Sequence, residues 1–320
     1  MSARPISGLK NLLASGLHAD SPARGVSFRR MTPKALMATA FIFVSLLASQ
    51  QSQAELPSLC SHFAGPAKAG IPISQKTGVT KAEFDGVAAK IDRLYREEFR
   101  SRGGTLKMRA NWESNSIDAR ANEFGWFWLV SLYGGLARQP GMTRDAFALV
   151  ACHEVGHHLG GAPNAILSPL TNEGQADYYA TLKCARRFFA DEDNLAALRK
   201  TGVERYLASE CRKEFSIVAE QYVCMRSGMA ALNLTRALQK INGDKKRISF
   251  QTPDTSTPVL FSKASHPPAQ CRLDTFLNGA RCPVPVNEAL SETSYWPGTC
   301  DRKNQPANTG SRPRCWFKPL

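Results

Sequence analysis

Residues 151–160 are Ala151-Cys152-His153-Glu154-Val155-Gly156-His157-His158-Leu159-Gly160, a His-Glu-x-x-His sequence inside an apolar run with helical character. Four residues of α-helix rise about 6 Å and turn almost full circle, so His153 and His157 project from one face. Two imidazoles placed in this way can bind one metal ion, at about 2.0–2.1 Å if it is zinc. Glu154 would lie beside the metal, where a carboxylate can take a proton from water. The alternative is a core helix whose histidines are satisfied by hydrogen bonds.

A catalytic zinc usually has three protein ligands and an open fourth position. One common continuation places a third histidine after Gly160, but Pro163 occupies that position and cannot bind a metal. His158 would substitute poorly, because it points about a hundred degrees away from the face of His153 and His157. The third ligand is therefore expected from another segment.

A second helix beginning at Glu173 can supply that ligand. Thr171 or Asn172 can cap it, and small residues on the stripe of Glu173 permit a close approach to the first helix. Glu173 would bind the metal, and Asp177, one turn later, would accept the free ring N–H of a ligand histidine. The alternative is a solvated carboxylate pair on a helix surface.

At these residues the chain resembles the gluzincin metallopeptidases, specifically the family that contains the CAAX prenyl protease and the HtpX-like and Oma-like enzymes. That family has His-Glu-x-x-His followed by a Glu-x-x-x-Asp helix. Weaker similarities extend the resemblance to roughly residues 84–280. The matching segments are His153, Glu154, His157, Glu173 and Asp177; Asn115-Ser116-Ile117-Asp118-Ala119-Arg120-Ala121 with Trp126 to Gly135; and Ser265-His266-Pro267-Pro268 with Arg272.

The resemblance implies an α+β, mainly helical fold: a zincin-like catalytic core with a small antiparallel sheet and an HExxH helix. It implies a zinc endopeptidase in which His153, His157 and Glu173 bind Zn²⁺ and Glu154 is the general base. His266 would donate to the oxyanion, cover the metal in a resting state, or simply start a helix. Arg272 would position Asp177 or substrate.

The substrate implied is a protein or peptide. In zincins an edge strand ahead of the metal helix pairs with extended substrate, so residues 115–121 are either that edge or an ordinary hairpin strand. A rival function is an envelope assembly factor or chaperone, without catalysis or with weak catalysis, that retains a zincin fold. A second rival is a structural zinc protein, which would give Glu154 no purpose. The short gap between the two metal helices and the many cysteines depart from the family pattern.

Residues 1–54 have the features of a targeting segment. Arg29-Arg30-Met31-Thr32-Pro33-Lys34 is a basic region, residues 35–49 are apolar but too few to span a bilayer, and Ser52-Gln53-Ala54 ends as a cleavage site. Translation is expected to begin at Met31. The protein is therefore predicted to be exported, periplasmic or secreted; an uncleaved signal would instead anchor it in the membrane.

The chain is basic, with a formal charge of +14. Residues 1–54 carry six basic side chains and one acidic, and the remaining 35 basic and 26 acidic side chains give +9. This charge is compatible with peripheral association with the envelope. No cluster of Arg and Lys interleaved with aromatic residues indicates binding to nucleic acid.

Nine cysteines agree with an oxidising compartment, which would permit up to four disulfides and one remaining thiol. Cys271–Cys282 and Cys300–Cys315 are the predicted local pairs, among 105 connectivities that eight cysteines allow. Cys152 is expected to be a buried thiol or to form a bridge, because it leaves the helix about a hundred degrees from the ligand face.

Hydrophobic periodicity predicts the remaining elements. A helix is expected over 81–102, strands over 105–110, 117–121 and 124–133, a metal helix capped by Thr143, the Glu173 helix to about Ala190, two or three helices over 203–241, a loop over 243–263 and a short helix from His266. The predicted segments are an N-terminal extension with signal peptide (1–54), a linker (55–80), a metallopeptidase domain (81–282) and a Cys/Pro-rich tail (283–320).

Overall fold

A computed structural model describes residues 78–165, 168–257, 266–303 and 308–318, all within one compact unit, Pro57–Leu320. The predicted signal peptide, the alternative anchor, Cys60 and most of the predicted linker lie outside these residues, and the predicted segment boundaries stay predictions. No helix in the described part has the length and apolar character needed to cross a bilayer.

The elements are α2 (Lys81–Ser101), β1 (Thr105–Asn111), β2 (Ala119–Phe124), β3 (Phe127–Tyr133), α3 (Gly134–Ala137), α4 (Arg144–Leu159), α5 (Glu173–Tyr179), the π-helix η1 (Ala180–Cys184), α6 (Ala185–Phe189), α7 (Asn194–Thr201), α8 (Arg205–Glu214), α9 (Val218–Asn242) and α10 (Ala269–Arg281).

The fold is α+β and mainly helical, as predicted, but the three-stranded sheet is mixed and not antiparallel throughout. Its order is β1-β3-β2, with β1 parallel and β2 antiparallel to β3. After β1 the chain crosses to the far edge, and the tight β2–β3 hairpin then inserts β3 in the middle. Side-chain alternation reveals strands but not their spatial order, which is why the parallel pair was not predicted.

The crossing segment between β1 and β2 is held by Arg138, whose side chain is only 1% exposed. Its guanidinium donates hydrogen bonds to the carbonyls of Trp112 and Ser114 and to Oδ1 of Asn115. The strand itself begins at Ala119, two residues later than predicted, and forms an edge of the sheet.

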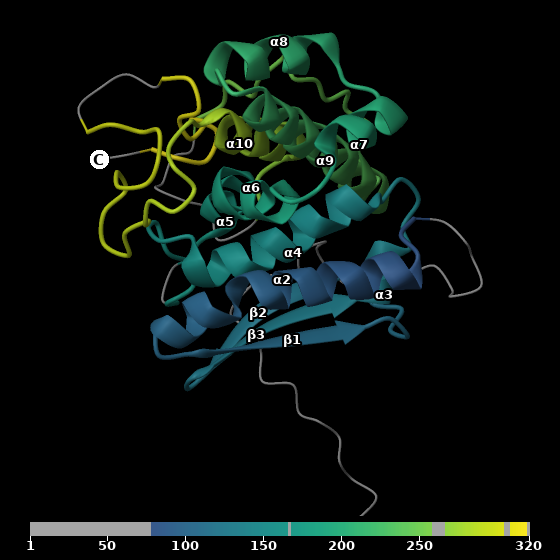
Figure 1. Cartoon of the computed structure of the whole chain (residues 1–320), viewed down its shortest axis with the longest axis vertical. Helices are drawn as coiled ribbons and strands as arrows, with labels where there is room; N and C mark the ends of the chain where they lie inside the picture. Colours follow the sequence, from purple (N-terminus) through teal and green to yellow (C-terminus); the bar gives the residue numbers. More distant parts are fainter. Residues whose placement is uncertain (1–77, 166–167, 258–265, 304–307, 319–320) are drawn as a thin grey trace, which may run out of the picture. The chain divides into compact units, whose positions relative to one another are not determined.

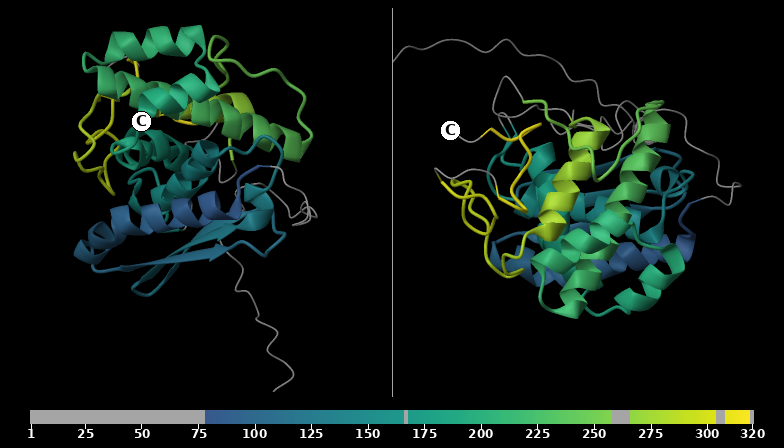
Figure 2. Two further views of the ribbon diagram at one scale, coloured as in Figure 1. Left: turned by 45° about the vertical axis from the view of Figure 1, so that its right-hand side comes forward. Right: turned by 90° about the horizontal axis from the view of Figure 1, so that it is seen from above.

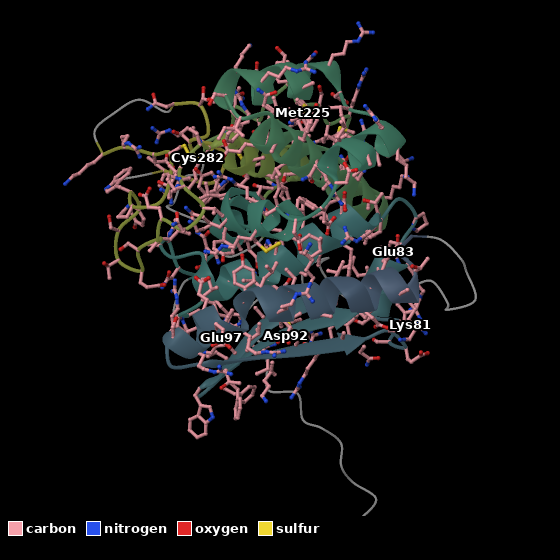
Figure 3. All side chains as sticks on the ribbon, viewed as in Figure 1. Lys81, Glu83, Asp92, Glu97, Met225 and Cys282 are labelled. Carbon is pink, nitrogen blue, oxygen red and sulfur yellow. A yellow bond between two sulfur atoms is a disulfide. The ribbon has the colours of Figure 1, made fainter. Side chains whose placement is uncertain are left out.

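Helices α2 and α4 lie over one face of the sheet, with α9, α10 and α8 beyond them (Figure 1; Figure 2, left). Helix α2 begins with a capping box between Thr80 and Glu83 and buries its predicted apolar stripe. Lys81 and Glu97, both labelled in Figure 3, lie on its exposed side. The core between the layers is aromatic and aliphatic, and its largest fully buried members include Phe84, Phe99, Phe147, Ile91 and Leu132.

Helix α4 is the central helix, and nearly all its side chains are buried. Thr143 caps it by accepting from the amide of Ala146, and Asp145 occupies its first turn, where a carboxylate favours the helix dipole. It ends at Leu159, and Gly161 continues with a φ of 68°. Thr143 is the cap that was predicted.

The predicted helix from Glu173 to about Ala190 is three consecutive segments, α5, η1 and α6. Asn172 provides the cap, accepting from the amide of Gln175. The π-helical turn was not predicted, because it adds one residue to a turn without interrupting the apolar pattern. Helix α7 was not predicted either.

Four disulfides connect the described cysteines, and the two predicted pairs are wrong. Cys271 lies near the start of α10 and Cys282 directly after its end, so the ten helical residues between them separate them by about 16 Å. A disulfide requires Cα atoms within about 7 Å, so the helix excludes this pair. The bridges are Cys152–Cys184, Cys211–Cys224, Cys271–Cys315 and Cys282–Cys300.

Candidate metal centre

His153 and His157 project from one face of α4 and are 0% and 4% exposed. One helical turn separates them, and their rings lie 4.6 Å apart, centroid to centroid, almost perpendicular to each other. Burial on this scale is unusual for a polar side chain unless it is paired or bound to a metal. The sequence spacing thus produces the predicted convergence of two imidazoles.

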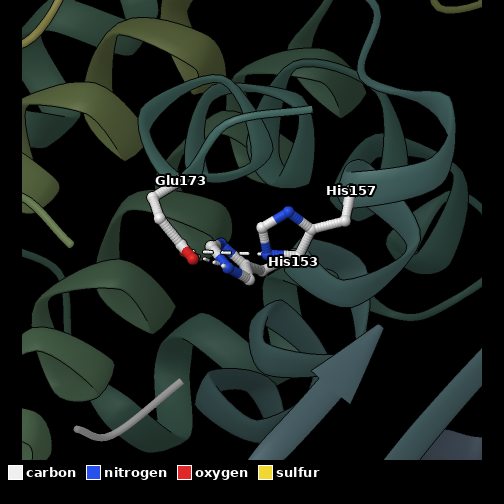
Figure 4. Close-up of side chains that lie close together, drawn as sticks. All are labelled: His153, His157 and Glu173. Atoms are coloured by element: carbon white, nitrogen blue, oxygen red, sulfur yellow. Dashed lines mark hydrogen bonds and ion pairs between the residues drawn. The ribbon is translucent and has the colours of Figure 1, made fainter. Parts of the chain in front are cut away.

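Glu173, the first residue of α5, brings its carboxylate to the same point (Figure 4). Its Oε2 lies 3.1 Å from Nε2 of His153 and 3.6 Å from Nε2 of His157. One donor atom from each of the three side chains falls within 4.8 Å of the other two. The three residues therefore form a buried group that can bind a metal ion.

The hydrogen bonds of the two histidines leave the correct nitrogens for a metal. Nδ1 of His153 lies 2.7 Å from Oδ1 of Asp177, and Nδ1 of His157 lies 2.8 Å from the carbonyl of Thr171. A carbonyl oxygen only accepts, so His157 donates from Nδ1, and the Asp177 carboxylate likewise favours a proton on Nδ1 of His153. Each ring then directs its Nε2 toward Glu173, which leaves that nitrogen as the one that a metal-binding histidine uses.

The spacing of the donor atoms also fits a metal ion. A tetrahedral ion that holds its ligands at 2.0–2.2 Å separates them by roughly 3.3–3.5 Å. The two distances from Glu173 Oε2, 3.1 and 3.6 Å, bracket that range. Two imidazoles and one carboxylate are a donor set suited to a borderline divalent cation.

The charges of the group favour binding of a cation. Burial lowers the pKa of His157 to about 4, so its ring is neutral at physiological pH. Burial would also lower the pKa of His153, but the facing carboxylates of Asp177 and Glu173 outweigh it and raise that pKa to about 9. Burial would raise the pKa of Glu173, but His266 and His157 hold it well below its usual range. A metal ion would therefore replace the proton of His153 beside an ionised carboxylate.

Glu154 is 2% exposed and lies one residue along α4 from the first histidine. Burial, together with the negative charges of Glu173 and Asp118, raises its pKa to about 8, although His153 opposes this. Its carboxylate makes no hydrogen bond to another described residue. An acidic group of this kind can exchange a proton with a water molecule at the site.

His266 lies at the site but not in a helix, contrary to one of the predicted alternatives. Helix α10 begins at Ala269 with Pro268 as its N-cap, because each proline restrains the residue before it from helical geometry. Nε2 of His266 is 2.9 Å from Oε2 of Glu173, and its ring stacks on that of His153 with centroids 5.9 Å apart.

Arg272 on α10 binds Asp177 through two hydrogen bonds, from Nε to Oδ2 at 2.8 Å and from Nη2 to Oδ1 at 2.7 Å. Both side chains are buried. Burial would raise the pKa of Asp177, but Arg272 and His153 hold it below its usual range. An ionised Asp177 thus connects Arg272 to the ring of His153, and of the two partners predicted for Arg272 the structure brings it to Asp177.

Of the two alternatives predicted for Cys152, the structure has the bridge, whose partner was not predicted. The Cys152–Cys184 bridge ties the residue before His153 to the end of η1. Gly156 on α4 lies against α5 so closely that a Cβ there would meet the carbonyl oxygen of Ala176 at 2.9 Å. Cys184 lies on the same helical stripe as Glu173, and Cys152 is next to His153, so the sequence contained a signal for this bridge. The carbonyl of Thr171, which accepts from His157, leaves no signal in the sequence.

Residues of the C-terminal tail stabilise the position of α5 next to the end of α4. Nε2 of Gln175 donates to the carbonyl of Gly160 at 2.8 Å, and Oε1 of Gln175 accepts from Arg312 at 2.9 Å. Arg312 is 1% exposed and also pairs with Asp301. The junction of the two metal helices is thus fixed by a buried arginine from the tail.

One other group of donor atoms, Asp254 with Cys271 and Cys315, lies close together within the described residues. Its two sulfur atoms are bonded to each other, so they are unavailable to a metal. Comparisons with protein-family models, with curated proteins and with solved structures found no match.

Proposed function

We propose that this protein is an exported zinc-dependent endopeptidase of the gluzincin type. One observation carries the proposal: the donor atoms of His153, His157 and Glu173 converge in a buried group beside Glu154, whose carboxylate has no hydrogen-bond partner among the described residues. A closed structural metal site would not need a buried carboxyl group beside the three ligands. A hydrolytic site needs one as a base.

The residues have distinct roles in the proposed reaction. His153, His157 and Glu173 hold the ion, which when bound supplies Lewis-acid polarisation of the scissile carbonyl and of water. Glu154 takes a proton from the attacking water and transfers it to the leaving amine as the C–N bond breaks. His266 donates a hydrogen bond to the oxygen on which negative charge develops. Asp177 and Arg272 position the ring of His153.

Substrate is proposed to bind as an extended peptide along the open edge of β2. Among the described residues this strand is an edge strand that pairs with β3, and it contacts α4, the helix of the two histidines. An edge strand offers amide and carbonyl groups in the spacing that another extended chain requires. Main-chain pairing of this kind favours unfolded protein segments as substrates.

The four disulfides fit an oxidising compartment outside the cytoplasm. Together with the targeting features of residues 1–54, they support a periplasmic or secreted location. Export and hydrolysis are separable parts of the proposal, because fractionation of cells tests the first without reference to the second.

The test of hydrolysis compares wild-type protein with Glu154→Gln, using labelled casein and quenched fluorescent peptides. The wild type should bind zinc and cleave, lose activity to a chelator and regain it with added Zn²⁺. Glu154→Gln should bind zinc equally and lose activity by about 100-fold or more, because only the proton transfer is removed. Glu220→Gln, an exchange on the surface of α9 with its side chain 42% exposed, serves as the matched control.

Full activity in Glu154→Gln, or failure of the wild type to bind zinc, would refute the proposal. Binding of unfolded clients that persists without zinc and without Glu154 would instead support the envelope assembly factor.

A further inference from the structure

The β2–β3 hairpin ends in an exposed aromatic tip, Phe124-Gly125-Trp126-Phe127. Phe124, Trp126 and Phe127 are 54%, 66% and 37% exposed. Within the part of the chain that the structure describes, they are three of the five large hydrophobic side chains exposed to solvent; the other two are Ile217 and Val218. Such clustering marks an interaction site, since isolated exposed apolar residues are common but grouped ones are not.

The shape of the tip is suited to insertion of its aromatic side chains into a bilayer interface. Gly125 has a φ of 57°, which lets the chain reverse in the two residues between Phe124 and Phe127. The rings of Trp126 and Phe127 lie 5.6 Å apart, centroid to centroid. The aromatic side chains therefore project from a narrow turn, the position in which tryptophan and phenylalanine enter the interface of a bilayer.

Positive charge lies beside the tip on the same face of the sheet. Lys107 and Arg109 on β1 are exposed, and neither forms an ion pair with another described residue. Nζ of Lys107 lies 5.3 Å from the centre of the Phe127 ring. Glu123, the acidic neighbour of the tip, points to the opposite face, since side chains alternate along β2. Apolar rings flanked by unpaired cations match a bilayer that carries anionic headgroups.

We propose that this hairpin docks the protein on anionic phospholipid bilayers, with Phe124, Trp126 and Phe127 in the interface and Lys107 and Arg109 at the headgroups. Trp128, the residue after the tip, stacks on His158 with ring centroids 5.9 Å apart. His158 also donates from Nε2 to the carbonyl of Leu129. Docking would therefore hold the C-terminal end of α4, and the metal centre with it, near the membrane surface.

The experiment uses the full mature chain with vesicles of phosphatidylcholine alone or with added phosphatidylglycerol. Wild-type protein should sediment with the anionic vesicles and not with the neutral ones. Its tryptophan emission should shift to the blue and be quenched by brominated lipid. Raising salt from about 0.1 M to about 0.5 M should weaken binding, because it screens the headgroup charge.

Two variants and one control separate the contributions. Trp126→Ala with Phe127→Ala should weaken binding about tenfold or more and abolish the quenching. Lys107→Gln with Arg109→Gln should weaken it and reduce its salt dependence. Ile217→Ala with Val218→Ala removes comparable exposed apolar surface near α8, at the far end of the fold from the sheet (Figure 1), and should bind as wild type.

Absence of binding to anionic vesicles, or equal loss in the control and tip variants, would overturn the proposal. Circular dichroism and zinc content, unchanged in each variant, exclude unfolding as the cause. Because vesicle binding needs no metal, its failure is distinguishable from failure of the proposed hydrolytic function.

Discussion

Asp177 orients one of the candidate metal ligands, because its carboxylate accepts from both His153 and Arg272. Asp177→Asn keeps the shape of the side chain but removes the charge that Arg272 and His153 bind. We expect zinc affinity to fall by about 10–100-fold, as for other residues that orient metal ligands. Competition against a chromophoric chelator measures the change.

Asp145→Asn is the matched control for that measurement. Asp145 pairs with Arg226 in a similar two-point contact, at the opposite end of α4. Its loss should lower stability without altering zinc affinity. Equal loss of zinc affinity in both variants would show that Asp177 acts only through general stability.

The sequence was most informative about residues whose relation depends on helical spacing. His153 and His157 share a face because of the 3.6-residue period, and Glu173 and Asp177 follow the same rule on the next helix. His266 is different, since its approach to Glu173 depends on how α10 packs, and local sequence indicates a helix start only weakly. The backbone carbonyl of Thr171 leaves no sequence signal at all.

At the scale of elements, the helix that carries Glu173 is fixed by contact with the C-terminal tail. A Cβ on Gly174 would lie 2.2 Å from Cδ2 of Trp316, whose ring is buried and donates from Nε1 to Thr275. Gly174→Ala should therefore displace α5, reducing the free energy of unfolding by about 1–3 kcal/mol and weakening zinc binding. Urea unfolding and chelator competition measure the two effects.

Gly86→Ala is the control, because a Cβ at this position of α2 would meet nothing within 4 Å. It should stabilise the protein slightly, by about 0.5–1 kcal/mol. If the clash is with the indole, Trp316→Leu combined with Gly174→Ala should cost less than the sum of the single changes. Strict additivity would contradict the proposed contact.

Glu192, between α6 and α7, joins three helices through Lys90, Arg144 and Arg226. Burial raises its pKa, but hydrogen bonds from Arg144 and Lys90 outweigh it and lower the pKa to about 2. Because the folded-state pKa is depressed, this stabilisation is complete above the usual value of 4.5 and is lost as pH falls from 4.5 through about 2.

Glu192→Gln should thus lower the free energy of unfolding at pH 7 by about 1–2 kcal/mol, a value reduced because the carboxylate is only partly buried. Near pH 2 the difference from wild type should almost vanish. Urea unfolding of metal-free protein at both pH values tests this. A difference that is the same at both would show that the charge of Glu192 contributes nothing.

Elements were predictable where their pattern is local. Apolar periodicity and Thr143 gave α4, and the run of β-favouring residues from Phe124 gave β3. The order of the strands depends on the course of the chain between Trp112 and Asp118, which Arg138 stabilises from a distant position in the sequence. No local pattern encodes such a contact.

At the scale of the whole molecule, the disulfides differ in what they connect. Cys152–Cys184 joins α4, which carries two of the candidate metal ligands, to η1, which directly continues the helix of Glu173, whereas Cys211–Cys224 joins α8 to α9. Replacing either pair with serine should cost about 2–5 kcal/mol of stability. Only loss of Cys152–Cys184 should also weaken zinc binding, measured by chelator competition under conditions where both variants remain folded. The same zinc affinity in both would contradict a role for this bridge at the site.

The sequence predicted up to four bridges and an oxidising compartment, with which the four disulfides agree, but it did not predict the pairing. Eight cysteines can pair in many ways, and the separation along the chain says little about distance in space once a helix such as α10 intervenes. The tail that contributes Cys300 and Cys315 returns to α10 and packs against α5 through Trp316. The tail can pack in this way only against the assembled core, so no local sequence pattern predicts it.

The Cys152–Cys184 bridge has a consequence for the order of steps in the biosynthesis of the protein. A nascent chain leaves the ribosome with both sulfurs as thiols, and the bond forms only where an oxidant is present. In a protein exported as proposed, the link between α4 and η1 would then be completed only after translocation. For an enzyme of the proposed kind, this order of maturation would protect the proteins of the producing cell from cleavage.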